Sequence, residues 1–543
     1  MKFDLVMFES REAEIRSRGL WSDKTIQSYF DQVVKMAPDK TAVVAYRKDC
    51  AEPQRITYRA LDDLARRIAL SLTVLGVRRH DVVSFQLPNW WEFIALMLAC
   101  VRIGAVANPL MHILREHELK FMLDLAETKV FIVPRSFRGF DYQSMARQLQ
   151  TSLPKLNQVV VVDGDGDDSF DRVLLKERDA SEQPAFEPLQ PDDVVLVMYT
   201  SGTTGEPKGV MHTSNTVFAA AHSLIERLGI TPDDNVLSAS PLSHLTGWVV
   251  LATIPLMLGS TAVLQDIWEG RRALEIMAKE KIGFSAASTP FLVDMCEGVA
   301  AGMLRPPNFR LFLCAGAPIP PVLVERARDT MGLTVCSCWG MTEMAAGSVT
   351  EPGRASEKSS VSDGCPLPNV ELLVADESGN ELPVGETGRL LLKAPWLFGG
   401  YLKRPHLSTL DEKGWFDTGD LAYADAEGYI RINGRTKDVI IRGGENIPVM
   451  TVENLLYGHP SVASVAVVPY PDARMGERAC AFVVLKPGES LTFDEMTKYF
   501  DEIKLTKQYR PERLEIVQEL PSTASGKIQK FRLREMAKRF GNI

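Results

Sequence analysis

Residues 199–209 read Tyr-Thr-Ser-Gly-Thr-Thr-Gly-Glu-Pro-Lys-Gly and directly follow the apolar run Val194–Met198. The apolar run predicts a buried strand, and the glycines after it let backbone N–H groups approach an anion closely. Lys208 adds a positive charge for phosphate oxygens. The segment is not the common P-loop, because Pro207 stands where that motif requires glycine. Hydroxyl donors come from Thr200, Ser201, Thr203 and Thr204. A strand followed by such a loop favours a phosphate-binding loop, and the alternative is a flexible Gly/Thr surface loop.

Around this loop, short apolar runs alternate with helical patterns. Val82–Leu87, Val130–Val133 and Val159–Val162 have the pattern of strands, and Trp91–Val101 has that of a buried helix. Such alternation is typical of α/β architecture with largely parallel sheets. The sequence therefore predicts a large α/β domain built around the loop.

The pattern changes near the C-terminus. A helix is expected at Val449–Tyr457, with strands at Val462–Val468 and Ala479–Leu485. We predict a large N-terminal domain over residues 1–436 and a small α+β domain over residues 437–543.

The composition is that of a globular protein with more than one domain: 543 residues, 45% hydrophobic and 24% charged. The net charge of -9 offers no basic surface for nucleic acid. Met1–Ser10 lacks the charged start and apolar core of a secretory signal. The eight cysteines are scattered without a C-x-x-C pair, so we expect reduced thiols in a cytoplasmic protein.

One uncharged stretch, Leu245–Gln265, is long enough to span a bilayer. Pro255 and Gly259 divide it into shorter pieces. We therefore expect a buried helix, a turn and a buried strand, with no membrane span.

The loop motif at residues 201–209 resembles the phosphate loop of the adenylate-forming superfamily, which comprises acyl-CoA synthetases, adenylation domains and luciferases. Further motifs in the family's order extend the resemblance from about Thr57 to Lys530. The resemblance implies an N-terminal domain of sheets flanked by helices with a smaller β-rich subdomain, and a small mobile α+β C-terminal domain. It also implies ATP, Mg²⁺ and coenzyme A as cofactors. The ATP-binding loop residues would be Thr200, Ser201, Gly202, Thr203, Thr204 and Lys208.

Residues 241–247, Pro-Leu-Ser-His-Leu-Thr-Gly, resemble the segment that lines the carboxylate pocket in this family. His244 would gate the pocket by moving its ring; the alternative is a histidine of the core. The resemblance implies an acyl pocket made of His244, Trp248, Phe291, Gly316, Met341 and Met344.

Two motifs resemble the family's adenine site: Cys-Ala-Gly-Ala-Pro at 314–318 and Cys-Trp-Gly-Met-Thr-Glu at 338–343. Trp339 would stack on adenine, although many relatives have tyrosine there. Thr342 would bond the α-phosphate and Glu343 would hold Mg²⁺, since hard cations prefer carboxylate oxygen; the alternative for Glu343 is a solvated helix-start carboxylate. The nucleotide-contacting positions would be Gly316, Ala317, Pro318, Cys338, Trp339, Gly340, Met341 and Thr342.

Asp420, in Trp-Phe-Asp-Thr-Gly-Asp at 415–420, matches the ribose-binding aspartate of the family. A carboxylate can accept hydrogen bonds from both hydroxyls of a cis-diol. Arg435 matches the arginine near ribose and phosphate, and Lys437 matches the hinge position.

Gly443 and Gly444 match a loop that borders the pantetheine tunnel in acyl-CoA synthetases. Lys527, in Pro-Ser-Thr-Ala-Ser-Gly-Lys at 521–527, resembles the catalytic lysine of the small domain. Its cation would stabilise charge in the adenylation transition state. Acyl-CoA synthetases are acetylated in this context, so a lysine acetyltransferase is an expected partner. The catalytic set implied is Lys527, Thr200, Glu343 and His244.

The implied reaction forms an acyl-adenylate from an acid and ATP and then transfers the acyl group to CoA. The whole chain looks most like bacterial cyclohexanecarboxylate–CoA ligases and their medium-chain relatives, which predicts an alicyclic, aromatic or medium-chain monocarboxylic acid. The alternatives are a carrier-protein-loading adenylation enzyme, a fatty-acid–CoA ligase of other chain length, a luciferase-like enzyme and an inactive binding protein. The pocket motif has no aspartate for an α-amine, and Lys208, Glu343, Asp420 and Lys527 argue against an inactive protein.

Overall fold

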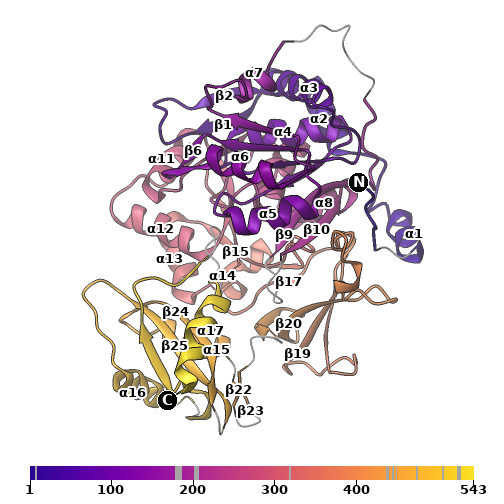
Figure 1. Cartoon of the computed structure of the whole chain (residues 1–543). Coiled ribbons are helices and arrows are strands. Elements are labelled where there is room, and N and C mark those ends of the chain that lie inside the picture. Colours follow the sequence, from indigo (N-terminus) through magenta and orange to yellow (C-terminus); the bar gives the residue numbers. More distant parts are fainter. Residues whose placement is uncertain are drawn as a thin grey trace.

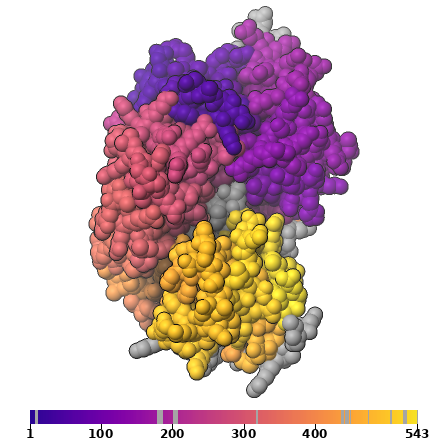
Figure 2. Space-filling view, turned by 90° about the vertical axis from the view of Figure 1, so that its left-hand side faces the viewer, coloured from indigo at the N-terminus to yellow at the C-terminus, as the bar shows by residue number. Residues whose placement is uncertain are grey.

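The computed structural model describes the chain apart from residues 7–8, 178–185, 201–206, 317–318, 436–439, 443–444, 448, 473–474, 504, 506, 523–527 and 543. Two large sheets with helices form the N-terminal part, a smaller antiparallel sheet follows, and a further mixed sheet forms the C-terminal part. The C-terminal residues, yellow in Figures 1 and 2, form a compact lobe below the N-terminal residues. The predicted fold class, a large N-terminal α/β domain with a small C-terminal domain, is confirmed.

The first large sheet has the strand order β17-β16-β15-β14-β13-β11-β12-β1-β2. Its central strands are parallel and the edge strands β2, β16 and β17 are antiparallel. The strands are β1 Thr41–Tyr46, β2 Gln54–Thr57, β11 Asn235–Leu237, β12 Ala262–Gln265, β13 Ile282–Ala287, β14 Leu311–Ala315, β15 Thr334–Trp339, β16 Ser348–Val349 and β17 Cys365–Pro366.

The second large sheet has the order β10-β9-β4-β3-β5-β8 and is parallel except at β10. Its inner strands are buried on both faces, so they appear in the sequence as continuous apolar runs. The strands are β3 Val82–Phe85, β4 Val106–Pro109, β5 Val130–Pro134, β8 Gln158–Val162, β9 Val194–Thr200 and β10 Lys208–Thr213. Each strand predicted in this region is therefore present.

Helix α4 (Trp91–Arg102) contacts β4 of the second sheet and β1 of the first. Its positions from Trp91 to Val101 are all buried, as expected of a helix that is apolar on every side. The other helices of this part are α1 Glu9–Ser17, α2 Ile26–Met36, α3 Tyr58–Val74, α5 Glu116–Leu125, α6 Tyr142–Ser152, α7 Phe170–Val173, α8 Ser214–Leu228, α11 Gly270–Lys279, α12 Thr289–Ala300, α13 Pro321–Met331 and α14 Ala355–Lys358.

The uncharged stretch at 245–265 folds as buried helix, turn and strand, as predicted. It forms the helical turn α9 (Leu245–Gly247), the π-helix η2 (Trp248–Thr253) and α10 (Ile254–Leu258). Gly259, at a φ of 70°, ends α10 in the left-handed conformation, and β12 follows. Within the described residues, no helix is long and apolar enough to cross a membrane.

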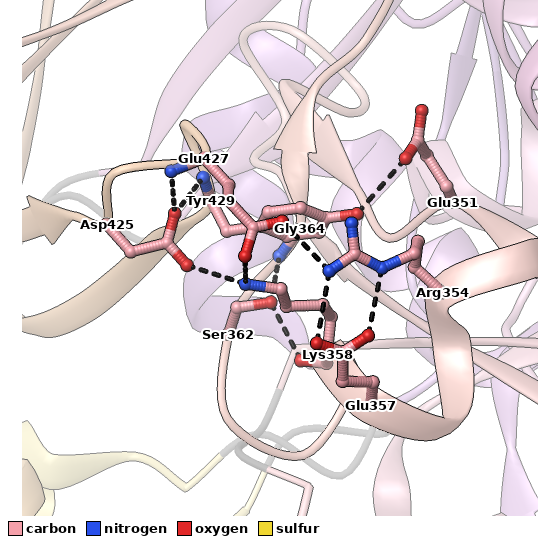
Figure 3. A network of polar contacts seen from close by, with 9 residues as sticks. All are labelled: Glu351, Arg354, Glu357, Lys358, Ser362, Gly364, Asp425, Glu427 and Tyr429. Atoms are coloured by element: carbon pink, nitrogen blue, oxygen red, sulfur yellow. Dashed lines mark hydrogen bonds and ion pairs between the residues drawn. The ribbon is translucent and has the colours of Figure 1, made fainter.

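The β-rich subdomain is an antiparallel sheet of β18 (Glu371–Ala375), β19 (Gly388–Lys393), β20 (Phe416–Ala424) and β21 (Ile430–Arg435). Figure 3 shows how the β20–β21 turn is fixed to α14. The buried Lys358 ammonium lies 2.9 Å from both Asp425 and Glu427. This pairing anchors the strand that carries Asp420.

The C-terminal part combines a mixed sheet with three helices of nine or ten residues. Its apolar clusters consist of residues from Ile440 onward and are separate from the N-terminal cores. Helix α15 spans Val449–Tyr457, the range predicted from the sequence. The other elements are β22 Ile440–Arg442, β23 Glu445–Ile447, β24 Val462–Asp472, β25 Gly476–Leu485, α16 Phe493–Glu502, β26 Arg513–Ile516 and α17 Lys530–Lys538.

Candidate active site

The predicted phosphate loop connects two paired strands. Thr200, the last residue of β9, lies opposite Lys208, the first residue of β10, in the antiparallel register. Both ends of the loop are thereby fixed at one edge of the second sheet (Figure 1). The predicted loop residues between them, Ser201, Gly202, Thr203 and Thr204, lie outside the described residues.

Tyr401 joins the loop to the predicted magnesium ligand. Its hydroxyl donates a hydrogen bond to Oε1 of Glu343 at 2.8 Å, and Nζ of Lys208 lies 4.6 Å from its ring centroid. Burial and the neighbouring Glu343 carboxylate raise the pKa of Tyr401, so the phenol stays neutral and can donate. Sequence reasoning missed Tyr401. The preceding Gly399–Gly400 pair was the available signal of a close backbone approach.

The turn at residues 339–345 presents the second predicted nucleotide motif. Gly340 has no room for a Cβ, which would meet the backbone of Ala345. Trp339, 8% exposed, donates from Nε1 to Oδ2 of Asp420 at 2.8 Å, and Asp420 is itself 3% exposed. Two predicted nucleotide residues from different sheets are therefore in direct contact.

A buried histidine supports the same turn. His212, on β10, lies 2.7 Å through Nε2 from the carbonyl of Thr342. Burial lowers the pKa of His212 to about 4, so the ring is neutral. Because a carbonyl only accepts, Nε2 carries the proton, and Nδ1 accepts from the Thr216 hydroxyl at 3.2 Å. Sequence reasoning did not identify His212.

Asp420 and Arg435, both assigned to the ribose region, lie opposite each other on β20 and β21 in the backbone register. Thr418 Oγ1 accepts from the backbone N–H of Asp420 at 3.1 Å. The two residues therefore share one region of the β-rich subdomain, at the strand anchored by Lys358.

Gly316 and Cys338 lie at neighbouring strand ends. Ala315 of β14 is paired with Cys338 of β15, and Gly316 follows with a φ of +85° that favours glycine. Burial raises the pKa of Cys338 to about 12, so its thiol is protonated at neutral pH. Ala317 and Pro318 lie outside the described residues.

The segment that carries His244 is held by a buried asparagine. Asn89 donates from Nδ2 to the carbonyl of Ser240 at 3.3 Å, and its Oδ1 accepts from the N–H of Leu242 at 2.8 Å. His244 directly precedes α9 and caps it, because its Nδ1 accepts from the N–H of Thr246 at 3.3 Å. Gly247 packs directly on the backbone of Pro241, and a Cβ would collide there. Asn89 was also missed.

Four of the six predicted acyl-pocket residues fall into two groups. Trp248, Met341 and Met344 belong to the main apolar cluster, with Trp248 edge-on to Phe93 at 6.1 Å. Phe291 packs instead against a second cluster, with its ring 5.4 Å from that of Trp268. Trp248 and Met344 are fully buried.

Four predicted site residues belong to the hinge and the C-terminal domain. Lys437, Gly443, Gly444 and Lys527 lie outside the described residues. Among the residues that are described, no group of three His, Cys, Asp or Glu side chains forms a ready-made metal cage.

Comparison with known proteins identifies the family. Residues 30–402 match the AMP-binding enzyme family, and residues 451–527 match the AMP-binding enzyme C-terminal domain. The medium-chain fatty-acid–CoA ligase of Escherichia coli (strain K12) is 36% identical over 542 residues, which cover 98% of this chain and 94% of the relative. The salicylyl-CoA synthase / salicylate adenylyltransferase of a Streptomyces species is 33% identical over 536 residues, which cover 96% and 95%. ATP-bound MatB from Rhodopseudomonas palustris superposes with a TM-score of 0.84 at 27% identity, covering 96% of this chain and 100% of that one. As its motifs predict, the chain belongs to the AMP-binding enzyme family of adenylate-forming enzymes.

Proposed function

We propose that this protein is an AMP-forming acid–CoA ligase that uses ATP, Mg²⁺ and coenzyme A. It joins a carboxylic acid to ATP as an acyl-adenylate, releases pyrophosphate, and transfers the acyl group to CoA with release of AMP. The observation that carries the proposal is the convergence of Lys208 and Glu343 on Tyr401, beside the strand pair that frames the phosphate loop. A cation and a carboxylate at such a loop suit a triphosphate and its metal ion.

Glu343 fits a magnesium ligand. Mg²⁺ in nucleotide sites is commonly held by one or two carboxylates together with substrate phosphates, so a cage of protein ligands is unnecessary. Glu343 is 5% exposed and supplies carboxylate oxygen, and the Tyr401 hydroxyl fixes its orientation. When bound, Mg²⁺ neutralises charge on the phosphates of ATP.

The nucleoside half of ATP would lie against the linked pair Trp339 and Asp420. The Asp420 carboxylate would accept hydrogen bonds from the ribose hydroxyls, and the indole of Trp339 would face the adenine. Arg435, opposite Asp420 in the register, would contact ribose or phosphate. This assignment is supported by the Trp339–Asp420 hydrogen bond.

In the first half-reaction the acid carboxylate attacks the α-phosphorus and pyrophosphate leaves. Thr200 and Lys208 hold the phosphates, His244 gates the acid, and Lys527 compensates the charge that develops between the carboxylate and the α-phosphate. In the second, the small domain rotates about Lys437 and brings Gly443 and Gly444 to the site. The CoA thiol then attacks the acyl carbonyl and AMP leaves. We place the domain boundary between residues 436 and 437.

The preferred substrate is a compact, uncharged monocarboxylic acid, with cyclohexanecarboxylate first and benzoate or acids of about six to eight carbons next. Residues 241–249, 286–291, 316–318 and 339–344 contain neither Lys nor Arg, so a second carboxylate would lack a partner. The relative named for medium-chain fatty acids supports a straight-chain acid, and the relative named for salicylate supports a ring-bearing acid.

All eight cysteines are described and free of disulfides, which suits a cytoplasmic enzyme.

The test is a panel of acids in two assays, acid-dependent exchange of pyrophosphate into ATP and CoA-dependent thioester formation. Cyclohexanecarboxylate, benzoate, octanoate, palmitate, succinate and phenylalanine cover the relevant sizes and charges. We expect exchange and thioester formation with the first three acids. A clear preference for palmitate, succinate or phenylalanine would refute the substrate assignment and leave the ligase chemistry standing.

A carrier-protein-loading adenylation enzyme is the second candidate. One of the relatives carries an adenylyltransferase name beside its CoA synthase name. Such an enzyme would exchange pyrophosphate with the acid and fail to form a thioester with free CoA, which separates the two functions in the same assays.

A further inference from the structure

We propose that Tyr401 is a positioning residue of the adenylation site, which orients the Glu343 carboxylate toward the metal of MgATP and seats the Lys208 ammonium beside it. The inference rests on the proposed function for the roles of Glu343 and Lys208. It assigns a role to a residue outside the nucleotide motifs, through the contacts that the fold gives it.

The backbone around Tyr401 is fixed to the strand that starts with Lys208. Gly399 donates to the carbonyl of Met211 at 2.8 Å, Met211 donates to Gly400 at 3.1 Å, and Leu402 donates to Gly209 at 2.8 Å. Val210 and Tyr401 thus form an antiparallel bridge. Tyr401 therefore has a fixed position relative to the phosphate loop.

The same segment holds Glu343 at two points. The N–H of Phe398 donates to the Glu343 carbonyl at 2.8 Å, and the Tyr401 hydroxyl donates to the carboxylate at 2.8 Å. The Phe398 and Tyr401 rings also pack at a centroid distance of 4.8 Å. Backbone and side chain of Glu343 are thus set by one segment, which leaves its carboxylate few orientations.

The aromatic ring of Tyr401 contacts the ammonium group of Lys208. Its centroid lies 4.6 Å from Nζ, a cation–π distance, and Tyr401 is only 4% exposed. The phenol gives the carboxylate a neutral donor and the ammonium a neutral face. A neutral phenol therefore contacts both groups without neutralising the charge of either.

The first test removes only the hydroxyl. Tyr401→Phe keeps the ring over Lys208 and takes the donor from Glu343. The matched control is Tyr46→Phe, because Tyr46 donates to the buried Glu280 carboxylate at 2.6 Å on the first sheet, outside the site. Calorimetry would measure the affinity for a non-hydrolysable ATP analogue with Mg²⁺ and with EDTA.

We expect Tyr401→Phe to weaken binding about tenfold with Mg²⁺ and less than twofold in EDTA, since a hydrogen bond to a charged group is lost. Tyr46→Phe should bind as wild type in both conditions. If Tyr401→Phe lost equal affinity with Mg²⁺ and in EDTA, or lost no affinity in either condition, the proposal would be overturned. The binding result stands even if wild type lacks acid-dependent pyrophosphate exchange, which would refute the proposed function alone.

A double-mutant cycle separates positioning from general packing. If Tyr401 acts through Glu343, Tyr401→Phe in a Glu343→Gln background should change Mg²⁺-dependent binding less than twofold further. Fully additive losses would show that the hydroxyl acts elsewhere. Tyr401→Leu, which also removes the ring, should weaken binding in EDTA as well, because Lys208 then loses the aromatic face that seats its ammonium. Unchanged affinity in EDTA would refute the role of the ring in placing Lys208.

Discussion

The indole N–H of Trp339 donates to the Asp420 carboxylate at 2.8 Å and so joins the end of β15 in the first large sheet to β20 in the β-rich subdomain. Both side chains are buried, so neither water nor another donor replaces this bond easily. A tyrosine at this position would have its polar atom at the far end of the ring. Trp339 instead couples the expected adenine contact directly to the expected ribose contact.

Replacing Trp339 should therefore act on ATP binding through Asp420. Trp339→Phe keeps an aromatic face and removes the N–H, which leaves Asp420 Oδ2 buried without this donor. We expect the KM for ATP to rise about tenfold and the free energy of unfolding to fall by about 1–3 kcal/mol. Trp21→Phe is the control, because the buried Trp21 donates to the Pro395 carbonyl at 2.8 Å. A KM for ATP within twofold of wild type would contradict the coupling.

Lys527 is expected to serve only the first half-reaction. Lys527→Ala should nearly abolish adenylation from acid and ATP, because the cation that stabilises the transition state is lost. The variant should still convert supplied acyl-adenylate and CoA to thioester. Rapid-mixing assays measure the rate of each half-reaction. If a folded variant lost both rates equally, the assignment of Lys527 to the first half-reaction alone would be wrong.

Gly444 is expected to matter for the second half-reaction. A leucine side chain there would crowd the pantetheine arm and leave the ATP site unchanged. Gly444→Leu should keep acid-dependent pyrophosphate exchange and lose thioester formation. Normal thioester formation by the variant would mean that this loop does not border the CoA path.

The fold was predictable where the sequence pattern is local. Helix α15 could be predicted with both ends because its buried residues, Val449, Val452 and Leu456, follow the helical period. Motif positions such as Glu343 and Asp420 could likewise be proposed from short segments. Tyr401 and Asn89 could not, since their partners lie 58 and 153 residues away and only the tertiary fold brings them together.

Histidine 112 should make the stability of the protein depend on pH. Burial and the charges of Arg138 and Arg115 lower the pKa of His112 from 6.5 to about 4. The unfolded chain therefore binds the extra proton between these values, so stability is lost as the pH falls from about 6.5 toward 4. In urea unfolding, His112→Gln should reduce the loss between pH 6.5 and 4.5 by about 2 kcal/mol. His117→Gln, at a nearby exposed position, is the matched control for removing a histidine from this segment. An equal effect in both variants would contradict the assignment to His112.

Asn89 should influence the acid through the segment that carries His244. Its amide bonds both Ser240 and Leu242, and the Pro241 carbonyl in turn accepts from the N–H of His244 at 2.9 Å. Asn89→Leu keeps the side-chain volume and removes both bonds. We expect the KM for the acid to rise about tenfold while the KM for ATP stays within twofold, because two buried backbone groups lose their partner beside the acid pocket alone.

The matched control for this variant is Asn235→Leu. Asn235 makes the same pair of bonds at a distance from the site, donating to the Glu280 carbonyl at 2.8 Å and accepting from the N–H of Thr261 at 3.3 Å. It should lower thermal stability and leave both KM values near those of wild type. If Asn235→Leu raised the KM for the acid as much as Asn89→Leu does, the effect would come from a general loss of stability, and the link from Asn89 to His244 would be wrong.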